Sequence, residues 1–283
     1  MFSIGKMLRI DSHQHFWKYD PLRHSWINED MVVLKRDFLP KDLAPILNLH
    51  DFDGCIVVQA DQAEQENEFL LNLAGRNDFI KGIVGWVDLR SPDLEGRLEY
   101  YQQFPKMKGF RHVLQDEEQR DLMLTKNFMN GINSLSNVGF TYDILIHEDQ
   151  LIYAEKLVAA NPDQRFVIDH IAKPRIRDKK VDLWKNNIIA IAKHNNVYCK
   201  LSGMVTEADW RNWKPEDFHP YLETVINAFG MDRVMYGSDW PVCNLVCSYE
   251  EMLKVLIQYF SQYSEEDNMK IFGGNATKFY QIG

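Results

Sequence analysis

Two histidines and a distant aspartate occupy positions from which they could share one reaction centre. His13 and His15 end an apolar N-terminal run, and Asp239 ends another apolar run near the C-terminus. Histidines two residues apart on an extended segment point to the same side, because side chains alternate between faces. Such imidazole pairs are first-choice ligands for zinc and similar metals. An aspartate at the end of another strand can complete such a site or act as its base.

Polar residues also close most of the other apolar runs of the chain. His170 follows the sixth run and is a candidate fourth member of the centre. Lys200 and Ser202 close the seventh run. His147 follows the fifth run, where a role in the site and a place in a loop are equally compatible with the sequence. The residues at the remaining run ends are candidates for substrate contact, namely Gln59, Trp86, Arg111, His112 and Asp143.

The elements that must position these residues are short strands separated by longer amphipathic stretches. After the first gap, the strand starts are separated by roughly 25 to 40 residues, the size of one strand–helix–strand unit. The predicted strands are Leu8–Ser12, Gly54–Gln59, Gly82–Val87, Lys108–Val113, Phe140–Ile144, Phe166–Asp169, Val197–Leu201 and Val234–Gly237. Apolar residues at helical spacing predict helices between them, among them Glu64–Ala74, Gln150–Ala160, Pro215–Phe229 and Tyr249–Tyr263.

Eight strands that alternate with helices favour a (β/α)8 TIM barrel, formed as a single domain by residues 1–283. A doubly wound open sheet is also compatible, because periodicity does not show closure. In a barrel the active site lies at the carboxyl ends of the strands. The polar residues at the run ends are therefore expected to meet at one mouth.

The first gap between strands differs from the others. Residues 16–43 are rich in aromatic residues without a clear period, and we expect a long loop over the barrel mouth. Its aromatic content argues against disorder. Trp17, His24 and Trp26 are the candidates in this loop for substrate contact, since aromatic faces suit sugar rings.

Composition excludes several classes of protein. The 283 residues carry a formal net charge of −9, which argues against a nucleic acid or an anionic membrane as partner. No run reaches the ~18 apolar residues of a membrane span, and no N-terminal stretch has the apolar region of a signal peptide. The four cysteines show no paired spacing, so we expect a reducing cytoplasm. Phe279 and Tyr280 could pack on a second subunit of a homo-oligomer or within the chain.

Other catalytic signatures are missing from the sequence. It has no Gly-x-Ser-x-Gly nucleophile elbow, no phosphate-binding Gly-x-x-x-x-Gly-Lys loop and no Gly-x-Gly-x-x-Gly after a strand. Hydrolysis by an activated water is the simplest reaction that fits the remaining candidates.

Motifs along the whole chain resemble the amidohydrolase superfamily. The resemblance is to the branch of sugar-lactone hydrolases, which includes fuconolactonases and rhamnonolactonases, and more distantly to 2-pyrone-4,6-dicarboxylate lactonases. The matching segments are Ile10–Trp17, Val57–Ala60, Gly85–Leu89, Lys108–His112, Val167–His170 with Lys173 and Pro174, Cys199–Gly203 and Gly237–Val242.

The resemblance implies a (β/α)8 barrel that opens a sugar-acid lactone, such as an aldono-1,4-lactone, to the aldonic acid. It implies that His13, His15, His170 and Asp239 form the site, with Asp239 and His170 catalytic and Arg111 on the substrate. Members of this branch hold either one divalent metal, zinc first, or none. A binuclear centre is not expected, because no lysine ends the fourth strand.

Two other functions remain open at this stage. One is a zinc-dependent decarboxylase of a small unsaturated or aromatic acid, because barrels of this superfamily perform that reaction. The other is a non-catalytic barrel that binds a metal or a sugar. Against the second stands Asp239 beside the histidines, because a pure binding site needs no base.

Overall fold

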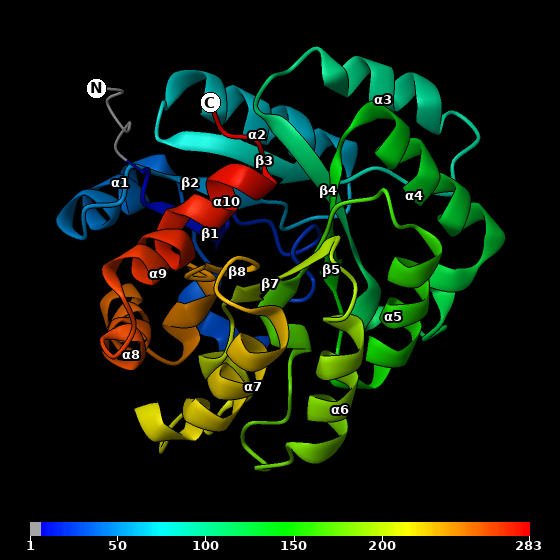
Figure 1. The fold of residues 1–283 in the computed structure, drawn as a ribbon. Coiled ribbons are helices and arrows are strands. Elements are labelled where there is room, and N and C mark those ends of the chain that lie inside the picture. The colour runs from blue at the N-terminus through cyan, green and yellow to red at the C-terminus, as the bar shows by residue number, and fades with distance from the viewer. Residues whose placement is uncertain (1–6) are drawn as a thin grey trace, which may run out of the picture.

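Eight parallel strands lie side by side in chain order, from β1 to β8 (Figure 1). The computed structural model describes residues 7–283. The predicted domain and the predicted absence of a signal peptide both include residues 1–6, which lie outside the described residues. The strands are β1 (Ile10–Gln14), β2 (Gly54–Val58), β3 (Ile80–Gly85), β4 (Met107–Val113), β5 (Thr141–Leu145), β6 (Phe166–Ile168), β7 (Val197–Leu201) and β8 (Val234–Tyr236).

The segment after β8 returns to β1 and joins the two edges of the sheet. The amide of His15 donates to the carbonyl of Trp240 at 2.7 Å, and the amide of Asp239 donates to the carbonyl of His13 at 2.8 Å. An isolated parallel bridge also links Gln14 to Trp240. These bonds make the sheet a barrel, so the expected (β/α)8 fold is confirmed and an open sheet is excluded.

Helices surround the strands on the outside (Figure 1). Among residues 7–283, eight of them follow the eight strands in turn, as α/β connections require, and two short helices at the C-terminus complete the set. They are α1 (Pro40–Leu49), α2 (Glu64–Arg76), α3 (Leu94–Gln102), α4 (Lys126–Val138), α5 (Leu151–Ala160), α6 (Asp182–Ile191), α7 (His219–Phe229), α8 (Tyr249–Phe260), α9 (Glu265–Met269) and α10 (Asn275–Phe279). Among the described residues, no helix has the length and apolar character needed to cross a bilayer.

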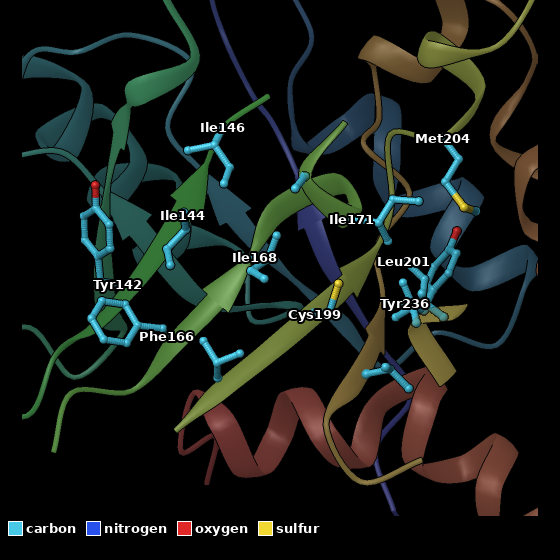
Figure 2. Close-up of a cluster of buried hydrophobic side chains, with 14 of the residues drawn as sticks. Tyr142, Ile144, Ile146, Phe166, Ile168, Ile171, Cys199, Leu201, Met204 and Tyr236 are labelled. Atoms are coloured by element: carbon cyan, nitrogen blue, oxygen red, sulfur yellow. The ribbon is translucent and has the colours of Figure 1, made fainter. Parts of the chain in front are cut away.

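Two apolar clusters hold the barrel together. The larger cluster packs the outer strand faces against the helices, and Figure 2 shows part of it, with Ile144, Ile168 and Leu201 on neighbouring strands. The smaller cluster fills the barrel interior, where Ile56, Val84 and Met235 meet the C-terminal helix α10. Phe279 and Tyr280 are 2% and 1% exposed in this inner cluster, so they pack within the chain.

The predicted elements agree with the structure except at their ends. β1 begins two residues later than predicted, and its register against β2 shifts between Asp11 and Gln14. The predicted helix 215–229 begins instead as a 3-10 turn, Pro215–Phe218, before α7. These differences are local, because hydrogen-bond geometry and not apolar pattern sets where an element ends.

The long aromatic segment after β1 has structure of its own. A bridge between Trp17 and Phe38 closes the segment on itself, and a 3-10 helix spans Glu29–Leu34 inside it. Helix α1 begins at Pro40, three residues before the predicted loop ends. Proline suits the first turn of a helix, because its missing N–H is not needed there.

Candidate active site

Four candidate residues come together at the carboxyl ends of three strands: His13 and His15 at β1, His170 after β6 and Asp239 after β8. The Oδ1 atom of Asp239 lies 3.3 Å from Nε2 of His15, 3.8 Å from Nε2 of His13 and 3.9 Å from Nε2 of His170. The Nε2 atoms of His13 and His15 are 3.2 Å apart. All four residues are at most 5% exposed. One carboxylate oxygen thus faces three imidazole nitrogens in a buried place.

Each imidazole ring is held by a second contact on its other nitrogen. Nδ1 of His15 lies 2.8 Å from the carbonyl of Val58, and Nδ1 of His170 lies 2.9 Å from Oγ of Ser202. A carbonyl can only accept, so Nδ1 of His15 donates to Val58, which leaves Nε2 as the ring nitrogen that faces the site. This is the arrangement that histidines adopt when they bind a metal.

The backbone around His170 takes an unusual path. His170, Ile171, Ala172 and Lys173 have φ angles of +54°, +48°, +61° and +46°. This left-handed region costs roughly 1–2 kcal/mol per non-glycine residue. The neighbouring Gly203 makes room for the turn, because a Cβ there would lie 2.5 Å from Nδ1 of His170. Asp239 also has a positive φ, of +57°. Such strain persists only where the surroundings impose it, and it gathers at functional sites.

A charged network lies directly beneath the cluster, inside the barrel. Nζ of Lys200 lies 2.5 Å from Asp143, 3.0 Å from Asp169 and 3.1 Å from Nδ1 of His13. Arg111 donates to Asp169 at 3.0 Å and to the carbonyl of Gln59 at 2.6 Å. Lys200, Asp143 and Asp169 are 0% exposed. The network fixes the position of His13 from below.

Burial and charge set the protonation states of the cluster. Burial lowers the pKa of His170 to about 4 and that of His13 well below its ordinary value. Burial alone would raise the pKa of Asp239, but His170, His15 and His13 together hold it below its ordinary value. At neutral pH the site therefore presents a carboxylate beside the neutral imidazoles of His13 and His170.

The donor set fits one divalent metal ion. Zinc ligands at 2.0–2.2 Å in a tetrahedral array lie about 3.3–3.6 Å from one another. His13, His170 and Asp239 offer donor atoms that all lie within 4.8 Å of one another, and all three are buried. His15 is outside that set of three, although its Nε2 contacts both His13 and Asp239.

A cavity of about 300 Å³ opens above the cluster. Its floor contains Asp239, His15, His170 and the predicted substrate residues Arg111 and Gln59. Trp26 of the aromatic segment lines it as well, with Nε1 donating to the carbonyl of Ala60 at 3.1 Å. The remaining lining is mostly polar, and consists of Arg23, Ser25, Ala60, Asp61, Gln62, Val113, Gln115, Asp116, Leu145, Lys173 and Val242.

Five predicted substrate residues do not line this cavity. Asp143 lies deeper in the barrel beside Lys200, and His112 points outward, where Nε2 pairs with Glu117 at 2.6 Å. Trp17 is fully buried against Phe38. The other two are His24, buried between aromatic rings, and Trp86, half-buried beside Asn67. The half-buried His147 is also outside the lining and begins a 3-10 turn.

Several residues of the site were not selected from sequence. Asp169 ends a predicted strand, but the sequence indicates its neighbour His170, a common metal ligand, as the candidate site residue. Lys173 belongs to one of the segments that match the family, but no sequence pattern around it predicts the left-handed turn in which it lies. Arg23 is one charge in a long loop. Its ion pairs with Asp61 at 2.8 Å and Glu66 at 3.3 Å appear only in the folded chain.

Comparison with known proteins places this chain in a family. A family model described as amidohydrolase matches residues 10–282. An L-fucono-1,5-lactonase of Burkholderia multivorans is 37% identical, over 97% of this chain and 96% of that protein. An enzyme of the same name from Burkholderia ambifaria is 34% identical over the same shares. The crystal structure of a B. multivorans amidohydrolase with bound zinc is 38% identical, with a TM-score of 0.94, and covers 98% of this chain and all of that one. The chain belongs to the amidohydrolase family.

Proposed function

We propose that this protein is a hydrolase that opens a sugar-acid lactone to its aldonic acid. The observation that carries the proposal is the carboxylate of Asp239, which faces three Nε2 atoms at the floor of a cavity. The lowered pKa keeps this carboxylate ionised at neutral pH, so it can accept a hydrogen bond from a water and take its proton as the water attacks. The relatives named L-fucono-1,5-lactonase support a lactone as the substrate.

The metal that suits these donors best is zinc. His13, His170 and Asp239 would hold it, with His15 beside them, and its open position would let it polarise a carbonyl oxygen or lower the pKa of a bound water. The zinc of the related crystal structure supports this choice, because that chain is 38% identical. We propose a single ion, since no other group of histidines, cysteines or carboxylates with this spacing occurs among residues 7–283.

The chain's own groups can carry the proton through both steps. Asp239 takes a proton from the attacking water, whose oxygen bonds to the lactone carbonyl carbon. This addition leaves one negative charge on the adduct. When the bond from that carbon to the ring oxygen breaks, Asp239 returns the proton to the ring oxygen. The histidines and Arg111 orient the substrate at the buried floor, where charges interact more strongly than in water.

The upper cavity suits a small polyhydroxylated ring. Gln62, Gln115 and Asp116 can pair with hydroxyl groups, while Trp26 offers an aromatic face. The cavity of about 300 Å³ is at the small end of ligand pockets. The partner is therefore a small molecule, and we propose a monomeric sugar lactone. The four cysteines are buried and unpaired, which supports a reducing cytoplasm as the compartment.

A panel of aldono-1,4- and 1,5-lactones tests the proposal, with acid release as the readout before and after chelation. The two ring sizes are compared because the relatives are named for the 1,5-lactone. We expect turnover of fucono-, galactono- or rhamnono-lactone, and loss of activity with the chelator that zinc restores. Release of carbon dioxide from a hydroxybenzoate, without acid release from any lactone, would replace the proposal by the decarboxylase.

The variant Asp239→Asn tests the role of the base. Removing a general base costs typically about 10²- to 10⁴-fold in rate, so kcat should fall by at least about 10²-fold with the fold intact. The exposed Asp163→Asn is the matched control and should leave kcat unchanged. Near-normal turnover by Asp239→Asn would refute the mechanism.

A further inference from the structure

A lysine that the mechanism does not use lines the floor of the same cavity. Lys173 stands in the lining with His15, His170 and Asp239. Its side chain is half-buried, and its backbone is the last of four consecutive left-handed residues that begin at His170. The turn that places the histidine at the site therefore also places Lys173 in the lining of the cavity.

The geometry of this turn explains why both side chains face the cavity. The amide of Lys173 donates to the carbonyl of His170 at 2.8 Å, which is an i to i+3 bond. In a turn of three residues, the side chains at i and i+3 lie one above the other. The two residues between them point away into the core: Ile171 and Ala172 are 0% exposed, and Ile171 is drawn in the apolar cluster of Figure 2. Trp184 also donates to the carbonyl of Ile171 at 2.7 Å, which holds the turn in place.

Lys173 differs from the other cations around the cavity in its ion pairs. Arg111 pairs with Asp169, and Arg23 pairs with Asp61 and Glu66. Lys173, in contrast, has no ion pair within 4.0 Å among residues 7–283. Burial raises the pKa of the half-buried Glu207, and the nearby charge of Lys173 offsets part of that rise. A lysine that lines a cavity without such an ion pair can offer its ammonium to an anion bound there.

We propose that Lys173 is a catalytic residue whose ammonium stabilises the negative charge that hydrolysis creates. The inference rests on the proposed function. A neutral lactone becomes an anionic adduct when water adds to its carbonyl carbon and Asp239 takes the proton. After the ring opens and Asp239 returns the proton to the ring oxygen, the new carboxylic acid loses its proton to water. Lys173 then faces the carboxylate of the product.

The kinetic test compares Lys173→Met with Lys173→Arg and Lys173→Gln. Removing one preorganised group that faces a developing charge costs about 10²- to 10³-fold in kcat, and we expect Lys173→Met and Lys173→Gln to lose that much. KM for the neutral lactone should change far less than kcat, and inhibition by the aldonate product should weaken. Lys173→Arg keeps the charge and should recover part of kcat. Lys180→Met, an exposed lysine of the same loop, is the control.

A binding test separates this inference from the proposed function. Calorimetry measures how much more tightly zinc-loaded protein binds L-fuconate than the uncharged L-fucitol. We expect Lys173→Met to lose at least tenfold of that preference, about 1.4 kcal/mol, even if no lactone proves to be a substrate. Equal losses of kcat in Lys173→Arg and Lys173→Met, or a full preference for the anion in Lys173→Met, would overturn the role of Lys173.

Discussion

Lys200 is the buried cation between Asp143 and Asp169 in the network under the site, and its removal should destabilise the fold. Replacing Lys200 by methionine keeps the volume of the side chain but leaves Asp143 and Asp169 without the cation that lies 2.5 Å and 3.0 Å from them. All three side chains are fully buried. Breaking a buried ion pair by removing one partner costs about 3–5 kcal/mol, because the remaining charge is left uncompensated.

This cost is large against the stability of a folded domain, which is about 5–15 kcal/mol. For a chain of this size, 1 kcal/mol shifts the melting temperature by about 2 °C, so Lys200→Met should melt about 6–10 °C below the wild type. Thermal unfolding at pH 7, followed by circular dichroism, measures the shift. The double variant Lys200→Met/Asp143→Asn should recover part of the loss, because it removes the carboxylate whose ion pair is lost, whereas Asp169 keeps Arg111 at 3.0 Å.

The loss of stability should depend on pH. Burial already raises the pKa of Asp143 to about 6 in the wild type, above its ordinary value of 3.8. Removing Lys200 raises that folded-state pKa further, so below it the folded variant binds a proton that the unfolded chain does not. The folded variant therefore gains stability relative to the wild type as the pH falls from 8 to 5. A melting temperature within about 2 °C of the wild type at pH 7, with no change toward pH 5, would refute this account of the network.

Two further predictions concern the surroundings of the site. Ser202→Ala removes the hydroxyl that lies 2.9 Å from Nδ1 of His170, and should weaken zinc binding about 10- to 100-fold. A competition titration with a coloured chelator measures the affinity. Ser134→Ala is the control, and equal zinc affinities of the two variants would contradict the prediction. Arg23→Ala removes the ion pairs that tie the aromatic segment to Asp61 and Glu66, which should raise KM up to about fivefold with kcat unchanged. Lys35→Ala, in the same segment, is its control, and a KM equal to that control would show that the pairs do not shape the cavity.

Much of the architecture follows from local pattern. Eight apolar runs at the spacing of strand–helix–strand units predict the barrel, because each unit must bury its own apolar face. The alternation of side chains places His13 and His15 on one side of a strand, and Asp239 ends another strand. Since carboxyl ends of parallel strands meet at one mouth, the reaction centre can be predicted before any contact is known.

The face that a side chain occupies is decided elsewhere. Arg111 and His112 are adjacent, and both are candidates for substrate contact in the sequence. In the structure Arg111 lines the cavity, whereas His112 pairs with Glu117 outside the barrel. A period of two shows that neighbours face opposite ways, but not which of them faces inward. That choice depends on the register between strands. Trp17 and Trp26 differ for a similar reason, since only the folded segment buries one and leaves the other at the cavity.

What the sequence by itself determined is the fold, because the spacing and periodicity of the apolar runs carry it; the four candidate residues of the centre came from their places at the run ends and from the family resemblance. Only the tertiary structure decided how the centre is held and charged. The left-handed turn at His170 exists because the core fixes Ile171 and because Gly203 leaves space for the ring. The Lys200 network joins strands β5, β6 and β7 to His13 on β1. Such contacts depend on distances between segments far apart in the chain, which no local pattern encodes.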